Sequence, residues 1–256
     1  MYHRGMIKSV RRERLQELLQ ARGAVAVTDL AEALDVSVAT ARRDVIALEE
    51  QGVVTRTWGG VQLAGTVDDP FQETLARGGA AKQRIGQAAA AMVEDGMTVI
   101  LDIGTTVHYA ALALSGRSIT VLTPSLPTFE VLRGHANVEL ILLGGVWSER
   151  YQCFDGLPVV DALARQQADV AFLGCSGVSE TGRVRDTSYG QSAIKRAMRT
   201  CAARVHLLAD REKFPGQGSA SPFDLGAIDG LVTDHDNLSP DLVARCRETN
   251  TEIHTV

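Results

Sequence analysis

The sequence predicts an α/β protein in two parts: a short helical domain that ends in a hairpin, joined to a larger domain with a doubly wound, mostly parallel sheet. A length of 256 residues fits one large or two modest domains, at about 150 residues each. The first sixty residues contain three helical patterns and a β-rich pair. After residue 80, β-rich runs alternate with helical stretches, which is typical of a parallel α/β sheet.

The composition is that of an ordinary globular chain. Apolar residues make up 45% and charged residues 22% of the sequence, which excludes disordered and fibrous proteins. The longest apolar runs hold six residues, whereas a membrane helix needs about 20. The N-terminal segment lacks a secretory apolar region, and the four cysteines have no C-x-x-C spacing. We therefore expect a cytoplasmic protein with free thiols, no metal site and no membrane partner.

The charge is uneven along the chain. The whole sequence carries −5, but residues 1–62 hold nine Lys/Arg against eight Asp/Glu. Five basic residues stand within the first fourteen positions: Arg4, Lys8, Arg11, Arg12 and Arg14. A basic arm for nucleic acid and a solvated helix face explain this cluster equally well.

The pattern of the first three helices predicts a DNA-binding module. Leucines at positions 15, 18 and 19 have helical spacing. Thr28 suits the N-cap of a second helix, and Ser37 suits the N-cap of a third helix that ends near Gly52. Two short helices separated by a three-residue turn form a helix-turn-helix at about residues 27–46. The third helix would then enter the major groove.

The third helix is expected to bury Val38, Ala41, Val45 and Leu48 on one face. Two β-rich runs after Gly52 predict a wing. The opposite face of the helix and the wing carry the expected DNA-binding residues, whose small side chains, hydroxyls and guanidinium groups suit base edges and phosphates: Ser37, Ala39, Thr40, Arg42, Arg43 and Arg56. A three-helix packing module without nucleic acid is the alternative.

The domain organisation follows from these patterns. Residues 1–62 form the winged helix-turn-helix DNA-binding domain, residues 63–79 form a linker with a polar, proline-terminated centre, and residues 80–256 form the second domain. A helix is expected at 80–94. Strands are expected at 97–101, 119–123, 138–143, 169–173, 205–209 and 230–233.

Small polar residues follow several of these strands. Asp102 ends one strand, and Gly104, Thr105 and Thr106 then open a helix. Backbone N–H groups and hydroxyls at a helix start suit a phosphate, and ligands of such sheets bind at the carboxyl ends of the strands. The other residues expected at this edge are Thr123, Ser125, Gly144, Gly174, Ser176 and Gly177.

Charged residues follow the later strands. Asp186 precedes a helix that contains Lys195, and Lys213 follows another strand end. A lysine would attract a phosphate and a carboxylate would accept sugar hydroxyls, although surface ion pairs explain Lys195 equally well. His108, on the helix after the glycine, is expected to pack half-buried rather than to bind a metal.

The N-terminal motifs resemble the winged helix-turn-helix of the DeoR family of bacterial repressors. They are Arg12-Glu13-Arg14-Leu15, Leu30-Ala31, Val36-Ser37, Thr40-Ala41-Arg42-Arg43-Asp44, Leu48-Glu49, Arg56 and Gly59-Gly60. Two positions depart from the family pattern: Ala41 stands where isoleucine is usual, and Trp58 stands where histidine is usual.

The second half resembles the sensor domain of the same family, which is similar to ribose-5-phosphate isomerase. Pro70-Phe71 and Lys82 continue the resemblance. The further matching residues are Asp102-Ile103-Gly104-Thr105-Thr106, Thr123, Ser125, Gly144-Gly145, Asp155-Gly156, Ala168-Asp169, Gly174, Ser176-Gly177, Gly182, Asp186, Lys195, Asp210 and Lys213-Phe214. Pro124 stands where asparagine is common, so a side-chain amide and a backbone donor are missing.

The resemblance implies a DNA-binding repressor of carbohydrate-metabolism genes whose affinity for double-stranded operator DNA changes with a phosphorylated sugar. It implies no catalytic residue and no cofactor beyond that effector. One reading helix binds too weakly for an operator, so we expect a homo-oligomer, a dimer or tetramer. The alternatives are a sugar-phosphate isomerase or deaminase with a DNA-binding head, using Asp102, Glu180 or Asp186 as base, and a DNA-binding scaffold whose sensor binds no ligand.

Overall fold

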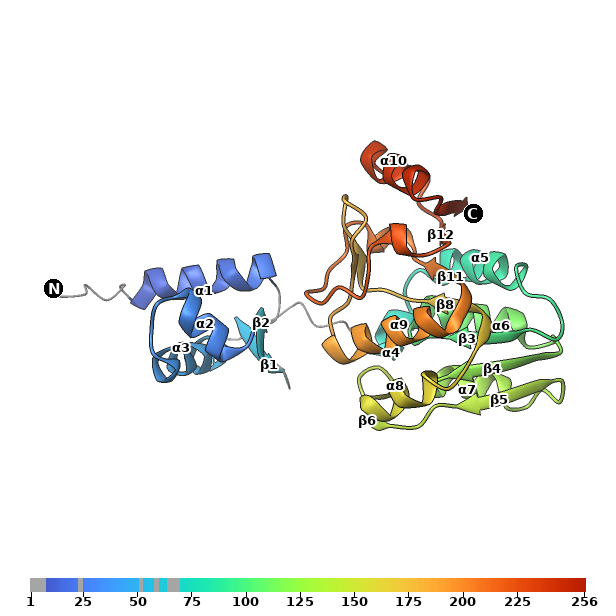
Figure 1. The fold of residues 1–256 in the computed structure, drawn as a ribbon, viewed down its shortest axis with the longest axis horizontal. Helices are drawn as coiled ribbons and strands as arrows, with labels where there is room; N and C mark the ends of the chain where they lie inside the picture. The colour runs from blue at the N-terminus through green and yellow to red at the C-terminus, as the bar shows by residue number, and fades with distance from the viewer. Residues whose placement is uncertain (1–7, 23–24, 51–52, 58–59, 64–69) are drawn as a thin grey trace. The chain divides into compact units, whose positions relative to one another are not determined.

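The computed structural model describes the chain outside residues 1–7, 23–24, 51–52, 58–59 and 64–69, and the chain divides into two compact units (Figure 1). The boundary along the chain falls between Asp68 and Asp69, and Gly218–Ala220 also group with the first unit. The predicted linker lies partly outside the described residues. Its later part contains helix α4 (Phe71–Leu75) of the second unit.

The first unit is a three-helix module with a wing. Its helices are α1 (Lys8–Arg22), α2 (Val27–Ala33) and α3 (Val38–Glu50), and its strands are β1 (Val54–Thr57) and β2 (Gly60–Leu63). The two strands pair antiparallel. Leucines of all three helices and Val61 of the wing are buried in one core. The winged helix-turn-helix architecture is therefore confirmed, while Trp58 and Gly59 lie outside the described residues.

Two local expectations are wrong in this unit. Thr28 lies inside α2, and Ala26 holds the N-cap position without a side-chain hydrogen bond. Val38 is 41% exposed rather than buried, because the first turn of α3 extends beyond the core. Asp44 is buried on the inner face of α3 instead.

The buried Asp44 explains part of the basic cluster. The Arg11 Nε donates to Asp44 Oδ2 at 2.5 Å, and the Arg12 Nε donates to Asp44 Oδ1 at 3.3 Å. Because a buried carboxylate requires compensation, these two arginines hold α1 against α3. They do not belong to a separate basic arm.

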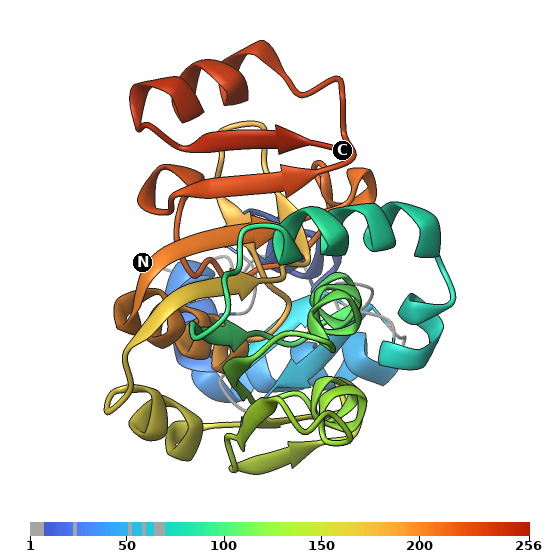
Figure 2. The same ribbon diagram turned by 90° about the vertical axis from the view of Figure 1, so that its right-hand side faces the viewer.

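The second unit contains a seven-stranded sheet in which every strand pair is parallel. Its strand order is β13-β12-β11-β8-β3-β4-β5, and Figure 2 shows this order from the red strands to the yellow-green ones. The strands are β3 (Thr98–Leu101), β4 (Ile119–Thr123), β5 (Val138–Leu142), β8 (Ala168–Leu173), β11 (Ala202–Leu208), β12 (Gly230–Thr233) and β13 (Glu252–Thr255). The six predicted strands are present, and β13 is an additional edge strand.

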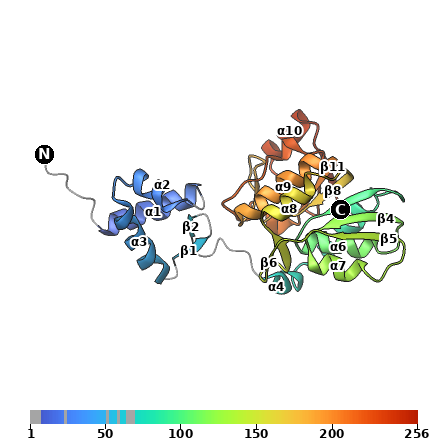
Figure 3. The same cartoon turned by 60° about the horizontal axis from the view of Figure 1, so that its bottom comes forward.

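Helices cover both faces of this sheet, as Figure 3 shows for α8 and α9 on one side and α6 and α7 on the other. Alternate residues of β8 enter the two cores: Val170 and Phe172 face one, and Ala171 and Leu173 face the other. The sheet is thus doubly wound, as predicted. The helices are α5 (Gly79–Ala90), α6 (Thr105–Leu114), α7 (Leu126–Leu132), α8 (Leu157–Leu163), α9 (Tyr189–Cys201) and α10 (Pro240–Glu248).

Two small hairpins and two 3-10 turns complete the second unit. The hairpins are β6 (Val146–Ser148) with β7 (Cys153–Asp155) and β9 (Gly177–Val178) with β10 (Val184–Arg185); the turns are η1 (Arg211–Lys213) and η2 (Leu225–Ala227). Across the ranges that the structure describes, no helix has the length and apolar character needed to cross a bilayer.

Candidate functional site

The carboxyl ends of β3 and β8 form the centre of the site. The two strands are neighbours, with Leu101 opposite Phe172, so Asp102 and Gly174 emerge side by side. The Gly174 N–H donates to Asp102 Oδ2 at 3.0 Å. The parallel register therefore brings together two residues that are 72 positions apart in the sequence.

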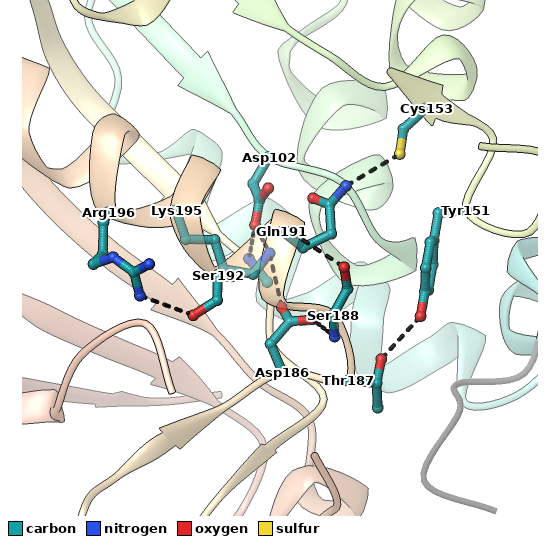
Figure 4. Close-up of polar contacts among 11 residues, drawn as sticks. Asp102, Tyr151, Cys153, Asp186, Thr187, Ser188, Gln191, Ser192, Lys195 and Arg196 are labelled. Atoms are coloured by element: carbon teal, nitrogen blue, oxygen red, sulfur yellow. Dashed lines mark hydrogen bonds and ion pairs between the residues drawn. The ribbon is translucent and has the colours of Figure 1, made fainter. Parts of the chain in front are cut away.

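Lys195 of α9 completes a buried charged cluster, consisting of Asp102, Asp186 and Lys195 (Figure 4). The Lys195 Nζ lies 2.5 Å from Asp102 Oδ2 and 3.4 Å from Asp186 Oδ2. Burial alone would lower the pKa of Lys195, but the carboxylates of Asp102 and Asp186 raise it above its ordinary value. The lysine therefore stays charged at neutral pH, and it is not a surface ion-pair residue.

The other carboxylate oxygens of this cluster differ in their surroundings. Asp186 Oδ1 accepts a hydrogen bond from the Ser188 N–H at 3.0 Å. Asp102 Oδ1 is buried, and within the described part of the chain it has no hydrogen-bond partner. Since buried polar atoms are nearly always hydrogen-bonded, Asp102 Oδ1 can accept a donor from a ligand.

The N-terminus of α6 lies directly after Asp102 in the chain. Gly104 has φ +105°, a conformation that L side chains rarely adopt, and it lets the chain turn into the helix. Thr105 and Thr106 follow and are buried. The first amides of a helix lack intrahelical partners, so this end of α6 presents donors to an anion.

Thr123 and Ser125 follow the neighbouring strand β4. The Ser125 N–H donates to Thr123 Oγ1 at 3.1 Å, and Ser125 Oγ caps α7 by accepting from the Thr128 N–H at 3.3 Å. Both hydroxyls thus stabilise the loop between β4 and α7. The Pro124 carbonyl accepts from the Phe154 N–H at 2.9 Å, which attaches this loop to β7.

Backbone contacts place two further predicted site residues, Ser176 and Gly177, but not Gly144. The Ser176 N–H donates to the Arg185 carbonyl. A Cβ on Gly177 would come within 2.7 Å of the Gln217 N, so only glycine fits between these backbone segments. Gly144 is exposed in the β5–β6 connection, and a Cβ on it would meet open space. No hydrogen bond recorded for the described residues links Gly144 to the charged cluster.

Lys213 lies in η1, next to the carboxyl end of β11. Burial raises the pKa of Asp210, while Lys213 and Lys82 oppose that rise. Asp210 Oδ1 accepts from the Glu212 N–H at 3.1 Å, and Asp210 Oδ2 is buried without a hydrogen-bond partner among the residues described. Cys175 is also close, and burial raises the pKa of its thiol to about 12. This region adds a second lysine to the carboxyl edge.

Several residues of this region carried no functional signal in the sequence. The Tyr151 hydroxyl lies 2.9 Å from Thr187 Oγ1, and the Gln191 Nε2 donates to Cys153 Sγ at 3.5 Å, as Figure 4 shows. The first contact joins the turn of the β6–β7 hairpin to the loop that carries Asp186, and the second joins β7 to α9. They form between segments about 36 residues apart, so local patterns could not reveal them.

The structure also places each predicted DNA-binding residue. Ser37, Ala39, Arg42 and Arg43 are exposed and Thr40 is half-buried at the start of α3. Ser37 Oγ accepts from the Thr40 N–H at 3.2 Å, and the Arg43 Nε donates to the Ala39 carbonyl at 3.2 Å. The exposed Val38 belongs to the same tip, whereas its helical spacing in the sequence predicts a place in the core.

Arg56 of the wing is paired within the unit. Its Nε lies 2.8 Å from Glu49 Oε2 of α3, and the Arg56 side chain remains 59% exposed. This ion pair ties the wing to the end of α3 and lowers the pKa of Glu49. Arg56 is accessible to a phosphate, but a neighbouring carboxylate competes for it.

No metal site accompanies these features in the described ranges, where no three His, Cys, Asp or Glu side chains converge as ligands.

Comparison with known proteins covers both units. The DeoR-like helix-turn-helix domain matches residues 11–67, and the DeoR C terminal sensor domain matches residues 78–235. The chain is 34% identical over 221 residues to the HTH-type transcriptional repressor GlcR of Bacillus subtilis, covering 85% of each protein.

Two further relatives match over a larger share of the chain. The Lactose phosphotransferase system repressor of Lactococcus lactis is 31% identical, covering 92% of this chain and 94% of its own length. The L-fucose operon activator of Haemophilus influenzae is 30% identical, covering 89% and 94%. The chain belongs to the DeoR family of DNA-binding transcriptional regulators.

Proposed function

We propose that this regulator represses carbohydrate-metabolism genes and that a phosphorylated sugar, bound at the carboxyl edge of the second unit's sheet, changes its affinity for operator DNA. The observation that carries the proposal is the buried cluster of Asp102, Asp186 and Lys195, with the unsatisfied Asp102 Oδ1 beside the start of α6. The names of two relatives support the same class of genes, since they refer to the lactose phosphotransferase system and the L-fucose operon.

The charges of the site favour one orientation of the effector. Two carboxylates and one ammonium give the buried cluster a net negative charge, so it repels a phosphate. A sugar hydroxyl can instead donate to Asp102 Oδ1. The phosphate then fits at the start of α6, where Thr105 and Thr106 lie, with Lys213 adding positive charge from η1.

The wider effector site consists of the residues that the sequence placed at the strand ends. Those that touch the charged cluster or open α6 are proposed to contact the ligand, and the others shape the surrounding loops. The set is Asp102, Gly104, Thr105, Thr106, Thr123, Ser125, Gly144, Gly174, Ser176, Gly177, Asp186, Lys195 and Lys213. No cofactor is proposed beyond this effector.

For DNA, we propose that the exposed tip of α3 enters the major groove of a repeated operator as part of a cytoplasmic homo-oligomer. Ser37, Ala39, Thr40, Arg42 and Arg43 would contact bases and phosphates, and Arg56 would contact a phosphate from the wing. A dimer or tetramer provides two or more α3 tips, which raises the affinity above that of one.

Titration of labelled duplex from upstream of the protein's own operon tests this proposal. Arg43→Ala is expected to weaken binding by about 5- to 150-fold, since one base or phosphate contact is worth about 1–3 kcal/mol. Arg133→Ala, which removes an exposed ion pair with Glu130 in the second unit, is the matched control and should leave the affinity unchanged. Equal affinities for the wild type and Arg43→Ala would contradict the assignment.

The effector is tested with the same titration in the presence of a panel of pentose and hexose phosphates. A member that binds the site should shift the operator affinity by about 5- to 150-fold, a coupling of about 1–3 kcal/mol, and should raise the melting temperature. Conversion of aldose to ketose phosphate in the same panel would favour an isomerase instead.

A further inference from the structure

Helix α4 is the first described helix of the second unit after the segment that joins the two units. It begins at Phe71 and ends at Leu75. The Phe71 ring is buried and meets His108 of α6 edge to face, with ring centroids 5.7 Å apart. Any signal that passes along the chain from the effector site to the first unit has to pass through this helix.

The first residue of α4 is attached to the turn of the β6–β7 hairpin, residues 149–152. The Phe71 N–H donates to the Arg150 carbonyl at 3.0 Å. The other end of α4 is held by the buried Lys82, whose Nζ donates to the carbonyls of Thr74 and Arg77 at 2.8 Å each. Both ends of this short helix are therefore fixed by tertiary contacts.

The same hairpin turn contacts the effector region. The Tyr151 hydroxyl is hydrogen-bonded to Thr187 at 2.9 Å, and Thr187 directly follows Asp186 of the charged cluster. A change in the position of Asp186 therefore displaces the partner of Tyr151. One residue earlier in the turn, the Arg150 carbonyl holds α4.

The turn combines a strained residue with open space beside it. Gln152 has φ +50°, a left-handed conformation that is strained for a residue other than glycine. An open surface pocket of about 380 Å³ lies beside α4, lined among others by Phe71, His108, Glu130 and Gln152. Because Gln72 and Leu75 of α4 also line this open pocket, α4 can shift toward it without displacing packed core side chains.

We propose that the hairpin turn 149–152 transmits effector binding to α4, with Tyr151 as the positioning residue that joins it to the Asp186 loop. This inference rests on the proposed function, because it takes the charged cluster as the effector site. A ligand that moves Asp186 changes the Tyr151–Thr187 contact. The turn then shifts the Arg150 carbonyl, which accepts the hydrogen bond from the Phe71 N–H. As a result α4 moves at the start of the second unit.

Amide hydrogen exchange of the full-length protein tests the mechanical part of this proposal without any ligand. Tyr151→Phe and Thr187→Val each remove one hydroxyl and are expected to speed exchange in peptide 70–77 about 5-fold. The double variant should be no faster than either single variant, because both delete the same contact. Thr120→Val, which removes a hydroxyl bonded to Glu139 at the other end of β4, is the matched control and should leave peptide 70–77 unchanged.

A change within the charged cluster tests the direction of transmission. Asp186→Asn is expected to speed exchange in peptide 70–77 when Tyr151 is present and to add nothing in a Tyr151→Phe background. If peptide 70–77 exchanges in Tyr151→Phe at the same rate as in the wild type, the proposal is overturned. Equal acceleration throughout α5 and β8 would also overturn it, since that result indicates a general loss of stability.

The regulatory part is measured with the sugar phosphate that shifts wild-type operator affinity most. In Tyr151→Phe the effector should still raise the melting temperature, but its effect on operator affinity should shrink about 5-fold. An unchanged effector response would overturn the proposal. If no sugar phosphate shifts the wild type, the proposed effector is wrong, while the exchange experiments still decide whether Tyr151 connects the charged cluster to α4.

Discussion

Replacement of Lys195 by methionine should destabilise the second unit strongly. Met has nearly the same length, so the change removes the charge with little loss of packing. It leaves the buried carboxylates of Asp102 and Asp186, which are 0% and 5% exposed, without their cation. Removing one partner of a buried ion pair typically costs about 3–5 kcal/mol. For a unit of this size that corresponds to a fall of about 6–20 °C in melting temperature.

Calorimetry and urea denaturation of the full-length protein measure this effect, with the transition of the second unit followed separately. Lys195→Met combined with Asp102→Asn should recover part of the loss, because one uncompensated carboxylate remains instead of two. Arg133→Met breaks an exposed ion pair with Glu130 and should cost less than about 1 kcal/mol. If Lys195→Met is as stable as Arg133→Met, the cluster does not depend on its cation and the electrostatic reasoning is refuted.

Three further outcomes are expected. Arg56→Ala should reduce the slope of the logarithm of DNA affinity against the logarithm of salt concentration by about 1. Glu49→Gln removes the carboxylate that competes for Arg56 and should therefore tighten binding to all duplexes. A titration in which Glu49→Gln weakens binding would contradict this. Gly86→Ala should cost about 1–3 kcal/mol in urea denaturation, because its Cβ would lie 2.6 Å from the backbone of α6, while Gly116→Ala, which meets open space, should not. Burial lowers the pKa of His206 below its ordinary value of 6.5. Its contribution to stability is therefore fully present above pH 6.5 and is lost as the pH falls from there through the lower pKa of the folded state, so the melting temperature should fall less on acidification in His206→Asn than in the wild type.

The fold was largely predictable because its elements carry local signals. The alternation of β-rich and helical runs predicted a parallel sheet, since most strands of the sheet are short and rich in apolar residues. β13 was missed because Glu252–Thr255 is short and half polar, so only its pairing with β12 identifies it. Val38 was misplaced for a related reason: helical spacing shows which face a residue occupies, but it does not show where the core ends.

The site was predictable only in part. Asp102 and Gly104 to Thr106 lie in one continuous motif at a strand end, so the chain order itself indicates the start of α6. Whether Lys195 lies buried against Asp102 could not be decided from the sequence, because the two residues are 93 positions apart and meet only through the packing of α9 on the sheet. Tyr151 lies in a turn without a motif, and its role depends entirely on that packing.

The raised pKa of Cys175 has a chemical consequence for the proposed effector site. Alkylating agents and peroxides react with the thiolate, and a pKa raised to about 12 keeps a thiol protonated at neutral pH. Cys175 is therefore expected to react more slowly with peroxides than a thiol of ordinary pKa. A sugar signal read at this edge would be insulated from the redox state of its surroundings.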